Sequence, residues 1–174
     1  HEALYAGGCV RDSLLGVTPA DYDIATSARP EEILDLFPGS DEVGAHFGVI
    51  IIRERGHSFE IATFRSDGPY LDGRRPDSVI FTDAENDARR RDFTINGLFE
   101  NPFTGEIVDY VGGREDLQNG ILRAIGTPGE RFAEDALRLI RAVRFATRTG
   151  FDITSSTWDA LRQDAALLAK VSPE

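Results

Sequence analysis

The N-terminal half of the chain alternates between short apolar runs and polar breaks, a pattern typical of short strands and helices. Residues 3–16 begin with an apolar run, pass through two glycines and continue with helical spacing, which predicts a strand, a turn and a helix. Residues 21–26 form the next predicted strand, and residues 27–37 predict a helix with acidic residues near its start. Residues 46–65 predict two strands joined by a turn at a glycine.

The pattern changes toward the C-terminus. Residues 66–79 are polar and interrupted by glycine and proline, which indicates a mobile loop. Residues 87–100 predict a helix, and residues 103–111 predict a strand of a hairpin. The remainder of the chain has helical spacing. We therefore expect an α+β domain over residues 1–127 and a helical domain over residues 128–174.

The formal net charge of −11, taken alone, argues against nucleic-acid binding. The distribution of the bases changes this picture, because all but one of them are arginines. They cluster at residues 89–91 and recur at Arg138, Arg141, Arg144 and Arg148. A planar guanidinium suits phosphate and base edges better than an ammonium group does. The sequence therefore predicts a local basic surface within an acidic protein.

Neither a membrane span nor a disulfide is expected. The chain has no apolar run long enough to cross a bilayer. Cys9 is the only cysteine, so no intramolecular disulfide can form, which fits the reducing cytoplasm. Because the sequence begins at His1 without a methionine and ends on Ser-Pro-Glu, we expect it to be a fragment of a longer cytoplasmic protein.

The first candidate site combines a glycine turn, an arginine and two aspartates. Gly7 and Gly8 allow a ligand to approach the backbone, and Arg11 follows one helical turn later, where it can contact a phosphate. In an extended segment Asp21 and Asp23 lie on one face, where their charges repel each other. Two such carboxylates can hold Mg²⁺ together with substrate phosphates. Each pattern alone is common without a ligand, but their combination at this spacing indicates a metal-dependent phosphate site.

Glu60 is a candidate for a third carboxylate at this site. It interrupts an otherwise apolar predicted strand, where an isolated acid is costly unless it is paired or bound to metal. The alternative is that Glu60 points to solvent from the polar face of a half-buried strand. The sequence leaves both interpretations open.

A second candidate site lies in the run RRRDFTINGL. In the predicted helix Asp92 and Asn96 are four residues apart and share a face with the arginine run that ends at Arg91. An acid and an amide can hydrogen-bond ribose hydroxyls while an arginine holds phosphate. A solvated basic face is the alternative interpretation.

A third candidate site lies in the run EDALRLIRAVRF, which we expect to be one helix. Helical spacing places Glu134, Arg138 and Arg141 on one narrow arc, flanked by Asp135 and Arg144. An aspartate and an arginine together offer the acceptors and donors needed to read the Watson–Crick edge of cytosine or adenine. The alternative is a surface helix with stabilising i,i+4 pairs. The opposite face is expected to pack as core, and it contains Ala136, Leu139, Ile140 and Val143.

The stretch GGCVRDSLLG and the following DYDIAT resemble the first motif of the class II tRNA nucleotidyltransferases and bacterial poly(A) polymerases, a polymerase-beta-like family. The resemblance implies a head domain with a small antiparallel sheet and flanking helices, followed by a helical neck. It also implies that Asp21 and Asp23 bind catalytic metal, whereas Gly8 and Arg11 hold the triphosphate.

Two further stretches extend the resemblance. RRRDFTIN is similar to the second motif of the family, which implies that Arg91 and Asn96 bind nucleotide and that Asp92 contacts the ribose 2′-hydroxyl. DYVGG, which includes Asp109 and Gly112, resembles the third motif, a hinge between head and helices.

The fourth motif of the family is a helix that acts as a protein template, and EDALRLIRAVRF resembles it. The resemblance implies that Asp135 and Arg138 read the incoming base. Arg141 and Arg144 are then expected to support the site and the phosphates, and Glu134 to support the template helix.

From this resemblance we expect an enzyme that adds C and A from CTP and ATP to the tRNA 3′ end with two Mg²⁺ ions, and that has the capacity to form a homo-oligomer. An enzyme that adds only A or only CC, and a poly(A) polymerase, are the nearest alternatives. The run DGRRP argues against a CC-only enzyme, and the absence of a basic run near residues 41–52 argues against a polymerase. A non-catalytic nucleotide- or RNA-binding module is the alternative from another class.

Overall fold

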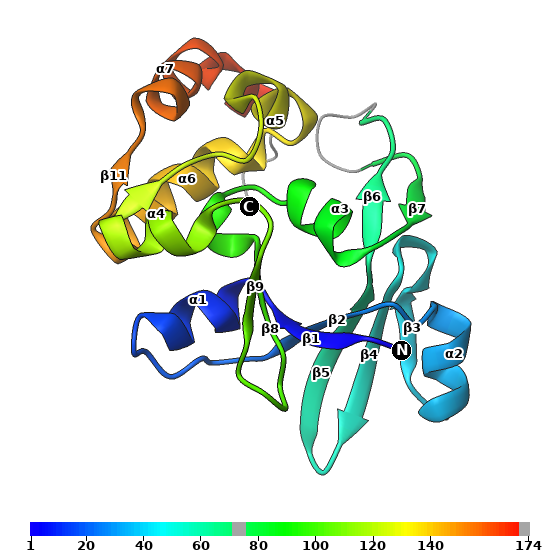
Figure 1. The fold of residues 1–174 in the computed structure, drawn as a ribbon. Helices are drawn as coiled ribbons and strands as arrows, with labels where there is room; N and C mark the ends of the chain where they lie inside the picture. Colours follow the sequence, from blue (N-terminus) through cyan, green and yellow to red (C-terminus); the bar gives the residue numbers. More distant parts are fainter. Residues whose placement is uncertain (71–75, 171–174) are drawn as a thin grey trace.

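The computed structural model describes residues 1–70 and 76–170 of the chain. Its centre is a seven-stranded sheet with the order β3-β4-β5-β2-β1-β8-β9 (Figure 1). Neighbouring strands are antiparallel except for β2 and β5, which run parallel. The strands of this sheet are β1 (Ala3–Ala6), β2 (Asp23–Thr26), β3 (Asp41–Gly44), β4 (Val49–Glu54), β5 (His57–Thr63), β8 (Leu98–Glu100) and β9 (Ile107–Asp109).

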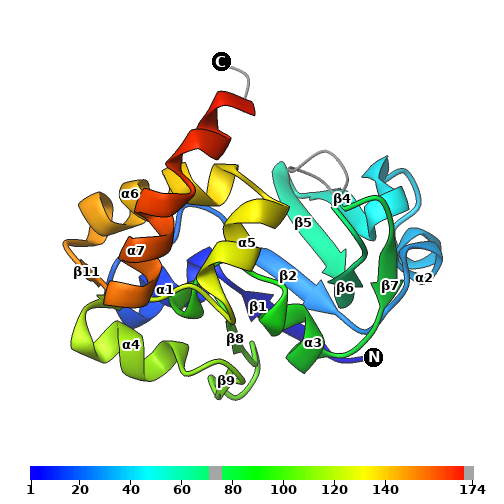
Figure 2. The same cartoon turned by 90° about the horizontal axis from the view of Figure 1, so that it is seen from above.

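Helices surround the sheet unevenly. Figures 1 and 2 show that the helices of the C-terminal part gather at one end of the molecule, with α1 beside them, whereas α2 lies at the far edge next to β3. The helices are α1 (Gly8–Leu14), α2 (Pro30–Leu36), α3 (Ala84–Arg89), α4 (Gly113–Asn119), α5 (Pro128–Glu134), α6 (Leu137–Thr149) and α7 (Ser155–Gln163), with 3-10 turns η1 (Ala45–Phe47), η2 (Thr94–Asn96) and η3 (Ala165–Lys170). None of the helices within the described ranges is long and apolar enough to span a membrane.

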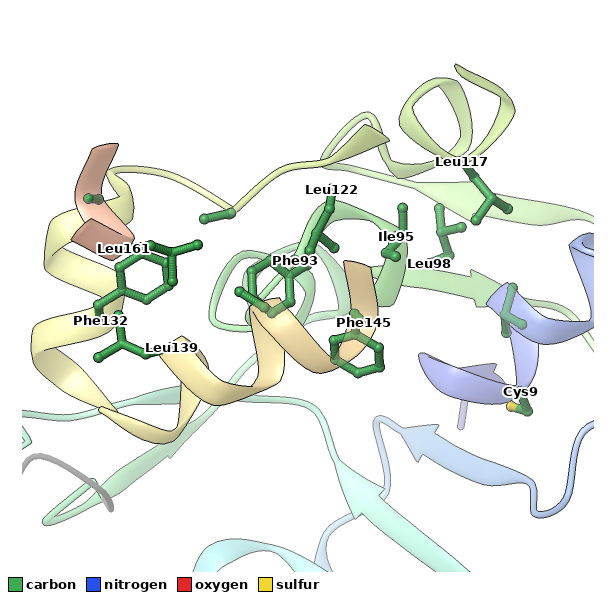
Figure 3. Close-up of a cluster of buried hydrophobic side chains, with 14 residues drawn as sticks. Cys9, Phe93, Ile95, Leu98, Leu117, Leu122, Phe132, Leu139, Phe145 and Leu161 are labelled. Atoms are coloured by element: carbon green, nitrogen blue, oxygen red, sulfur yellow. The ribbon is translucent and has the colours of Figure 1, made fainter. Parts of the chain in front are cut away.

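The largest buried cluster joins segments from both expected domains (Figure 3). Val10 of α1 and Phe93 pack in the same cluster as Phe132 of α5, Leu139 of α6 and Leu161 of α7. Burial of aromatic and aliphatic side chains is the dominant stabilising contribution in such a cluster. The head and the first helices after residue 127 therefore share one core cluster, and the expected division into two domains stays a prediction.

The predicted helix over residues 87–100 is wrong. α3 ends at Arg89, and the chain continues through η2 into β8. Every residue from 92 to 99 is buried, which one face of a surface helix cannot achieve. The backbone of this segment is instead hydrogen-bonded to the segment around residues 123–125: Thr94 N–H donates to Arg123 C=O at 2.9 Å, and Ile125 N–H donates to Asp92 C=O at 3.0 Å.

The predicted continuous helix through EDALRLIRAVRF is also wrong. Asp135 has extended backbone angles (φ −138°, ψ 104°) and separates α5 from α6, and its Oδ1 accepts the N–H of Leu137 at 3.0 Å. This break rotates α6, so that its buried side runs through Arg138, Leu139, Ala142 and Phe145. The expected apolar face is therefore only partly correct, since Ala136 and Leu139 are buried but Ile140 and Val143 are exposed.

The segment expected to be a loop has paired ends. β6 (Arg65–Asp67) and β7 (Val79–Phe81) form an antiparallel pair, and an isolated bridge joins Tyr70 to Pro76. The two arginines of the run DGRRP, at positions 74 and 75, lie outside the described residues. A further two-stranded parallel pair joins β10 (Ile121–Leu122) to β11 (Asp152–Ile153) next to the C-terminal helices.

Candidate active site

A pocket of about 990 Å³ lies where the sheet, the segment around α3 and the helix α6 meet. Its described lining contains eight arginines and five aspartates, although the chain as a whole is acidic. A basic pocket of this size suits a polyanion such as a nucleoside triphosphate. The structure brings eleven of the thirteen expected site residues to this pocket, all except Glu60 and Glu134: they are Gly8, Arg11, Asp21, Asp23, Arg91, Asp92, Asn96, Asp135, Arg138, Arg141 and Arg144.

The glycine turn between β1 and α1 depends on Gly7 rather than on Gly8. Gly7 has φ +69° and ψ −116°, a conformation that side chains with a Cβ rarely adopt. A Cβ at Gly7 would lie 2.8 Å from Nη1 of Arg91, whereas a Cβ at Gly8 would make an ordinary 3.8 Å contact with Arg11. The turn is tied to the sheet because Gly7 N–H donates to the C=O of Leu98 at 2.9 Å. Gly7 therefore allows Arg91 to approach the backbone beside the pocket.

Three carboxylates of the expected metal site come from adjacent segments. Asp21 precedes β2, Asp23 begins it, and Glu60 is the Cα partner of Asp23 across the parallel β2–β5 pair. Burial raises the pKa of Asp23, and the charge of Asp21 raises it further, against a smaller opposite effect of Arg91. The pKa of Glu60 is likewise raised, first by burial and then by Asp23. This concentration of negative charge is typical of a site for a cation.

Glu60 lines a neighbouring cavity rather than the main pocket. That cavity has a volume of about 220 Å³ and shares Asp23 and Arg91 with the main pocket. Within residues 1–70 and 76–170, no group of three or more His, Cys, Asp or Glu side chains has an arrangement that could by itself hold a metal ion. Asp21 and Asp23 would therefore need ligands from a substrate or water to complete a coordination shell.

A chain of hydrogen bonds links the first, second and fourth motifs. Arg11 Nη1 donates to Asn96 Oδ1 at 2.6 Å, and Asn96 Nδ2 donates to Asp92 Oδ1 at 3.1 Å. Arg141 Nε donates to Asp92 Oδ2 at 2.7 Å. The ring of Phe145 lies against both arginines, with each guanidinium carbon 5.1 Å from the ring centroid. Polar side chains linked in this way, three of them buried, hold one another in a single arrangement.

Asp12 extends this chain to the end of α6. Its Oδ1 accepts from Arg11 Nε at 2.8 Å, and its Oδ2 accepts from Arg148 Nη2 at 3.1 Å. Arg148 also lines the pocket. Sequence reasoning did not select Asp12, although it directly follows Arg11, because its partner Arg148 is 136 residues away.

Asp87 on α3 is the anchor of the arginine run, and sequence reasoning missed it. Only 1% of Asp87 is exposed, and its two carboxylate oxygens accept from Arg90 Nε at 2.9 Å and from Arg91 Nη2 at 2.9 Å. Burial raises the pKa of Asp87, but Arg90 and Arg91 outweigh this effect and hold the pKa below its usual value. The sequence does contain a signal for this anchor, because Arg90 and Arg91 follow Asp87 at the i,i+3 and i,i+4 spacing that brings side chains together on a helix.

The expected base-reading residues lie at the junction of α5 and α6. Arg138 is buried, and its Nη1 donates to Glu134 Oε2 at 2.7 Å and to the C=O of Arg131 at 3.1 Å, while its Nη2 donates to the C=O of Arg90 at 3.2 Å. Glu134 also accepts from Arg131 Nη2 at 2.7 Å. The i,i+4 pair of Glu134 and Arg138, which belonged to the alternative interpretation of this segment, is present, and it holds the guanidinium at the wall of the pocket.

The third expected motif has a local structural role in this fold. Asp109 Oδ1 accepts the N–H groups of Val111 at 3.0 Å and Gly113 at 3.1 Å, and its Oδ2 accepts the N–H of Arg114 at 2.9 Å. Gly112 has φ +76°, which directs the chain into α4. Asp109 and Gly112 therefore fix the conformation of the chain at the start of α4. The hinge motion expected at this motif stays a prediction.

Comparison with known proteins identifies the family. Residues 3–123 match the model of the poly A polymerase head domain. The chain is 48% identical to a CCA-adding enzyme of Lactiplantibacillus plantarum and 45% identical to one of Geobacillus stearothermophilus, in each case over the whole chain and 43% of the relative. The chain thus spans less than half the length of the curated relatives that it matches.

Solved structures agree with this match. A crystal structure of the Bacillus stearothermophilus CCA-adding enzyme in complex with CTP aligns with a TM-score of 0.88 at 42% identity, over 98% of this chain and 41% of that chain. A tRNA nucleotidyltransferase complexed with a primer tRNA and an incoming ATP analog aligns with a TM-score of 0.75 at 30% identity, over 98% and 49%. The fold, the motifs and these matches agree, and the chain belongs to the poly A polymerase head domain family.

Proposed function

We propose that the chain is the catalytic and nucleotide-selecting part of a template-independent tRNA nucleotidyltransferase that adds C and A from CTP and ATP to the tRNA 3′ end. The observation that carries this proposal is the arrangement of Asp21 and Asp23 at the same pocket as eight arginines. The similarity to CCA-adding enzymes supports the choice of product. The reaction is the attack of the terminal ribose hydroxyl on the α-phosphate of the nucleotide, with pyrophosphate as the leaving group.

In this proposal the arginines of the first two motifs bind the triphosphate. Arg91 lies next to Gly7 and Arg11 next to Gly8, where Gly8 allows the phosphates to approach the backbone. Asp92 and Asn96 bind the ribose hydroxyls, because their carboxylate and amide face the pocket beside Arg11. Arg141 and Arg144 support the phosphates and the site from α6.

Asp21 and Asp23 would hold two Mg²⁺ ions, with Glu60 beside them. Their carboxylates fit this role because the pKa of Asp23 is raised in a site that collects negative charge, which a divalent cation would relieve. Mg²⁺ is usually bound by one or two carboxylates together with substrate phosphates and water. When bound, the ions would favour deprotonation of the attacking hydroxyl and neutralise the charge of the leaving pyrophosphate.

Arg138 and Asp135 select the base in this proposal. The three hydrogen bonds that Arg138 makes to Glu134 and to two carbonyls use three of its five N–H groups, as counted over the described residues. The other two N–H groups can donate to the carbonyl or ring-nitrogen acceptors of a base. Asp135 supplies an acceptor for the exocyclic amine that cytosine and adenine share, and Glu134 holds Arg138 in place.

The test uses the full-length protein and tRNAs that lack the last one, two or three nucleotides, each with one labelled nucleoside triphosphate. We expect C to be added to the shortest tRNA and A to be added only after two C residues. Asp21→Asn should abolish incorporation, whereas Asp35→Asn, on an exposed residue of α2 outside the pocket, should retain it. Incorporation that survives in Asp21→Asn would contradict the assignment of the metal site.

A poly(A) polymerase is the second candidate function, because the matching family model carries that description. Long A tails on every tRNA substrate would favour it over CCA addition. Addition of A alone, or of CC alone, would assign the protein to the corresponding more specialised enzyme.

A further inference from the structure

Tyr70 lines the pocket and was not selected by sequence reasoning. The guanidinium carbon of Arg138 is 5.9 Å from the centroid of the Tyr70 ring. The Tyr70 hydroxyl donates a hydrogen bond to Asp67 Oδ2 at 2.6 Å. Tyr70 therefore connects the proposed base-reading arginine with the end of β6.

Asp67 is itself held firmly by neighbouring arginines. Its side chain is largely buried, and it accepts from Arg65 Nε at 3.2 Å and lies 3.8 Å from Arg90 Nη1. Asp87 joins these arginines to α3, because its Oδ1 accepts both the backbone N–H of Arg65 and the Nε of Arg90. The hydroxyl of Tyr70 is thus anchored to a charged cluster that belongs to the head and not to α6.

The hydroxyl keeps its proton in this environment. Burial raises the pKa of Tyr70, and the hydrogen bond to Asp67 raises it further. At neutral pH the hydroxyl therefore remains a donor to Asp67, and the ring keeps a fixed orientation relative to β6.

We propose that Tyr70 is a positioning residue for base selection, which it performs by holding the guanidinium of Arg138 through its ring while Asp67 holds its hydroxyl. A ring next to a guanidinium attracts it electrostatically and limits its rotation. Four contacts then define the place of Arg138: Glu134 and the C=O of Arg131 bind it from α5, and the C=O of Arg90 and the ring of Tyr70 bind it from the head. This inference rests on the proposed function.

The contact between Tyr70 and Arg138 should affect the discrimination between CTP and UTP more than the affinity for either nucleotide. Cytosine and uracil have nearly the same shape and differ in the exchange of an amine and a ring nitrogen for a carbonyl and an N–H group. Rejection of uracil requires donors and acceptors that cannot rotate to suit it, because an adaptable pair would accept both bases. An Arg138 without the Tyr70 ring has more freedom of rotation, so the ratio of C to U incorporation should fall.

The test compares Tyr70→Leu and Tyr70→Phe with the unmodified full-length protein. The readout is the ratio of kcat/KM for CTP to that for UTP on a tRNA that lacks its last three nucleotides, with thermal melting as a check of folding. Tyr70→Leu should lower the ratio roughly fivefold to thirtyfold, as expected for the loss of a partly desolvated cation–π contact. Tyr70→Phe keeps the ring but loses the hydrogen bond to Asp67, and should lower the ratio about threefold. This effect is smaller than the loss of a whole hydrogen bond to a charged group would cause, because the ring of Phe still contacts Arg138.

Phe103→Leu is the matched control, because Phe103 is 93% exposed at the turn between β8 and β9, outside the pocket. It should leave the ratio unchanged. An unchanged ratio in Tyr70→Phe, or an equal loss of kcat/KM for all four nucleotides in Tyr70→Leu, would overturn the inference. If Tyr70→Leu does not fold, Tyr70→Phe alone decides.

Failure of the proposed function has a different signature. In that case the unmodified protein adds neither C nor A, and no ratio exists to compare. A wild-type protein that adds C and rejects U, with variants that do the same, would leave the proposed function intact and refute only the role of Tyr70.

Discussion

Nε of Arg141 lies 2.7 Å from Oδ2 of Asp92, although 49 residues separate them in the sequence. This contact joins the helix α6 to the segment that follows α3 across the wall of the pocket. The same carboxylate accepts from Asn96 through its other oxygen. The proposed ribose-binding acid is thus oriented from two directions before any ligand binds.

A double-mutant cycle with Asp92→Asn and Arg141→Gln should show a coupling free energy of about 1 kcal/mol in unfolding. We expect a smaller coupling free energy than for a fully buried ion pair, because 45% of the Arg141 side chain is exposed and solvent screens the attraction. Urea unfolding of the four proteins measures it. The same cycle with Asp35→Asn in place of Asp92→Asn should give additive effects, and additivity in both cycles would contradict a stabilising pair.

Replacement of the two adjacent glycines should have clearly different effects on stability. Gly7→Ala should lower the free energy of unfolding by about 1–3 kcal/mol, because alanine is strained at φ +69° and its Cβ would displace Arg91. Gly8→Ala should be neutral or stabilising by up to about 1 kcal/mol, because Gly8 begins α1 with room for a Cβ. Chemical denaturation of both variants tests this, and equal effects would refute the role of the Gly7 conformation.

Asp87→Asn should lower the free energy of unfolding at neutral pH by about 3–5 kcal/mol, because it leaves Arg90 and Arg91 without their buried partner. The pKa of Asp87 is depressed in the folded state, so its stabilisation is present above the unfolded pKa of about 3.9 and is lost as the pH falls through the folded pKa. The difference between wild type and variant should therefore shrink below about pH 4. Denaturation curves at several pH values measure this, and a difference that is constant with pH would be inconsistent with it.

Asp23→Asn should stabilise the protein in the absence of metal while removing its activity. The pKa of Asp23 is raised in the folded state, so the ionised carboxylate costs stability as the pH rises above the unfolded pKa, and the neutral amide does not. Because the carboxylate of Asp23 is only partly withdrawn from solvent, the gain should not exceed about 1 kcal/mol. Melting temperatures in EDTA, and again with Mg²⁺ and CTP, measure the effect. We expect the ligands to raise the melting temperature of the wild type only, and a variant that melts lower in EDTA would contradict the electrostatic argument.

Local patterns predicted the elements that place the glycine turn and the carboxylates. The strand, turn and helix at the N-terminus and the hairpin around Gly56 are confirmed. The strand predicted over residues 21–26 is present only from Asp23 onward, so Asp21 lies before it. In each of them the side that faces the core follows from the spacing of apolar residues within a few positions. The mostly antiparallel sheet is also confirmed, with the one parallel pair placing Glu60 beside Asp23.

Segments whose conformation depends on distant partners were predicted incorrectly. Residues 92–99 were assigned to a helix although most of them are weak helix formers, and the strand partners of β8 and the backbone bonds of Thr94 and Ile125 hold them in another conformation. The break at Asp135 has a similar origin, because α5 and α6 must both pack against the core while Arg138 contacts the carbonyl of Arg90. Helix propensity is worth only tenths of a kcal/mol per residue, so such tertiary contacts override it.

The sequence by itself determined which residues could carry chemistry, since the Gly-Gly turn, the Asp-x-Asp pair, the arginine run and the Glu-Asp-x-x-Arg run are local patterns of residue type and spacing. Only the tertiary structure decided their partners: Arg141 with Asp92, Arg148 with Asp12, and Tyr70 with Arg138. These contacts join residues between 49 and 136 positions apart, and all three depend on how α6 packs on the head. The physical reason is that hydrogen bonds and ion pairs act over a few ångströms, and the distance along the chain does not determine the distance in space until the core has formed.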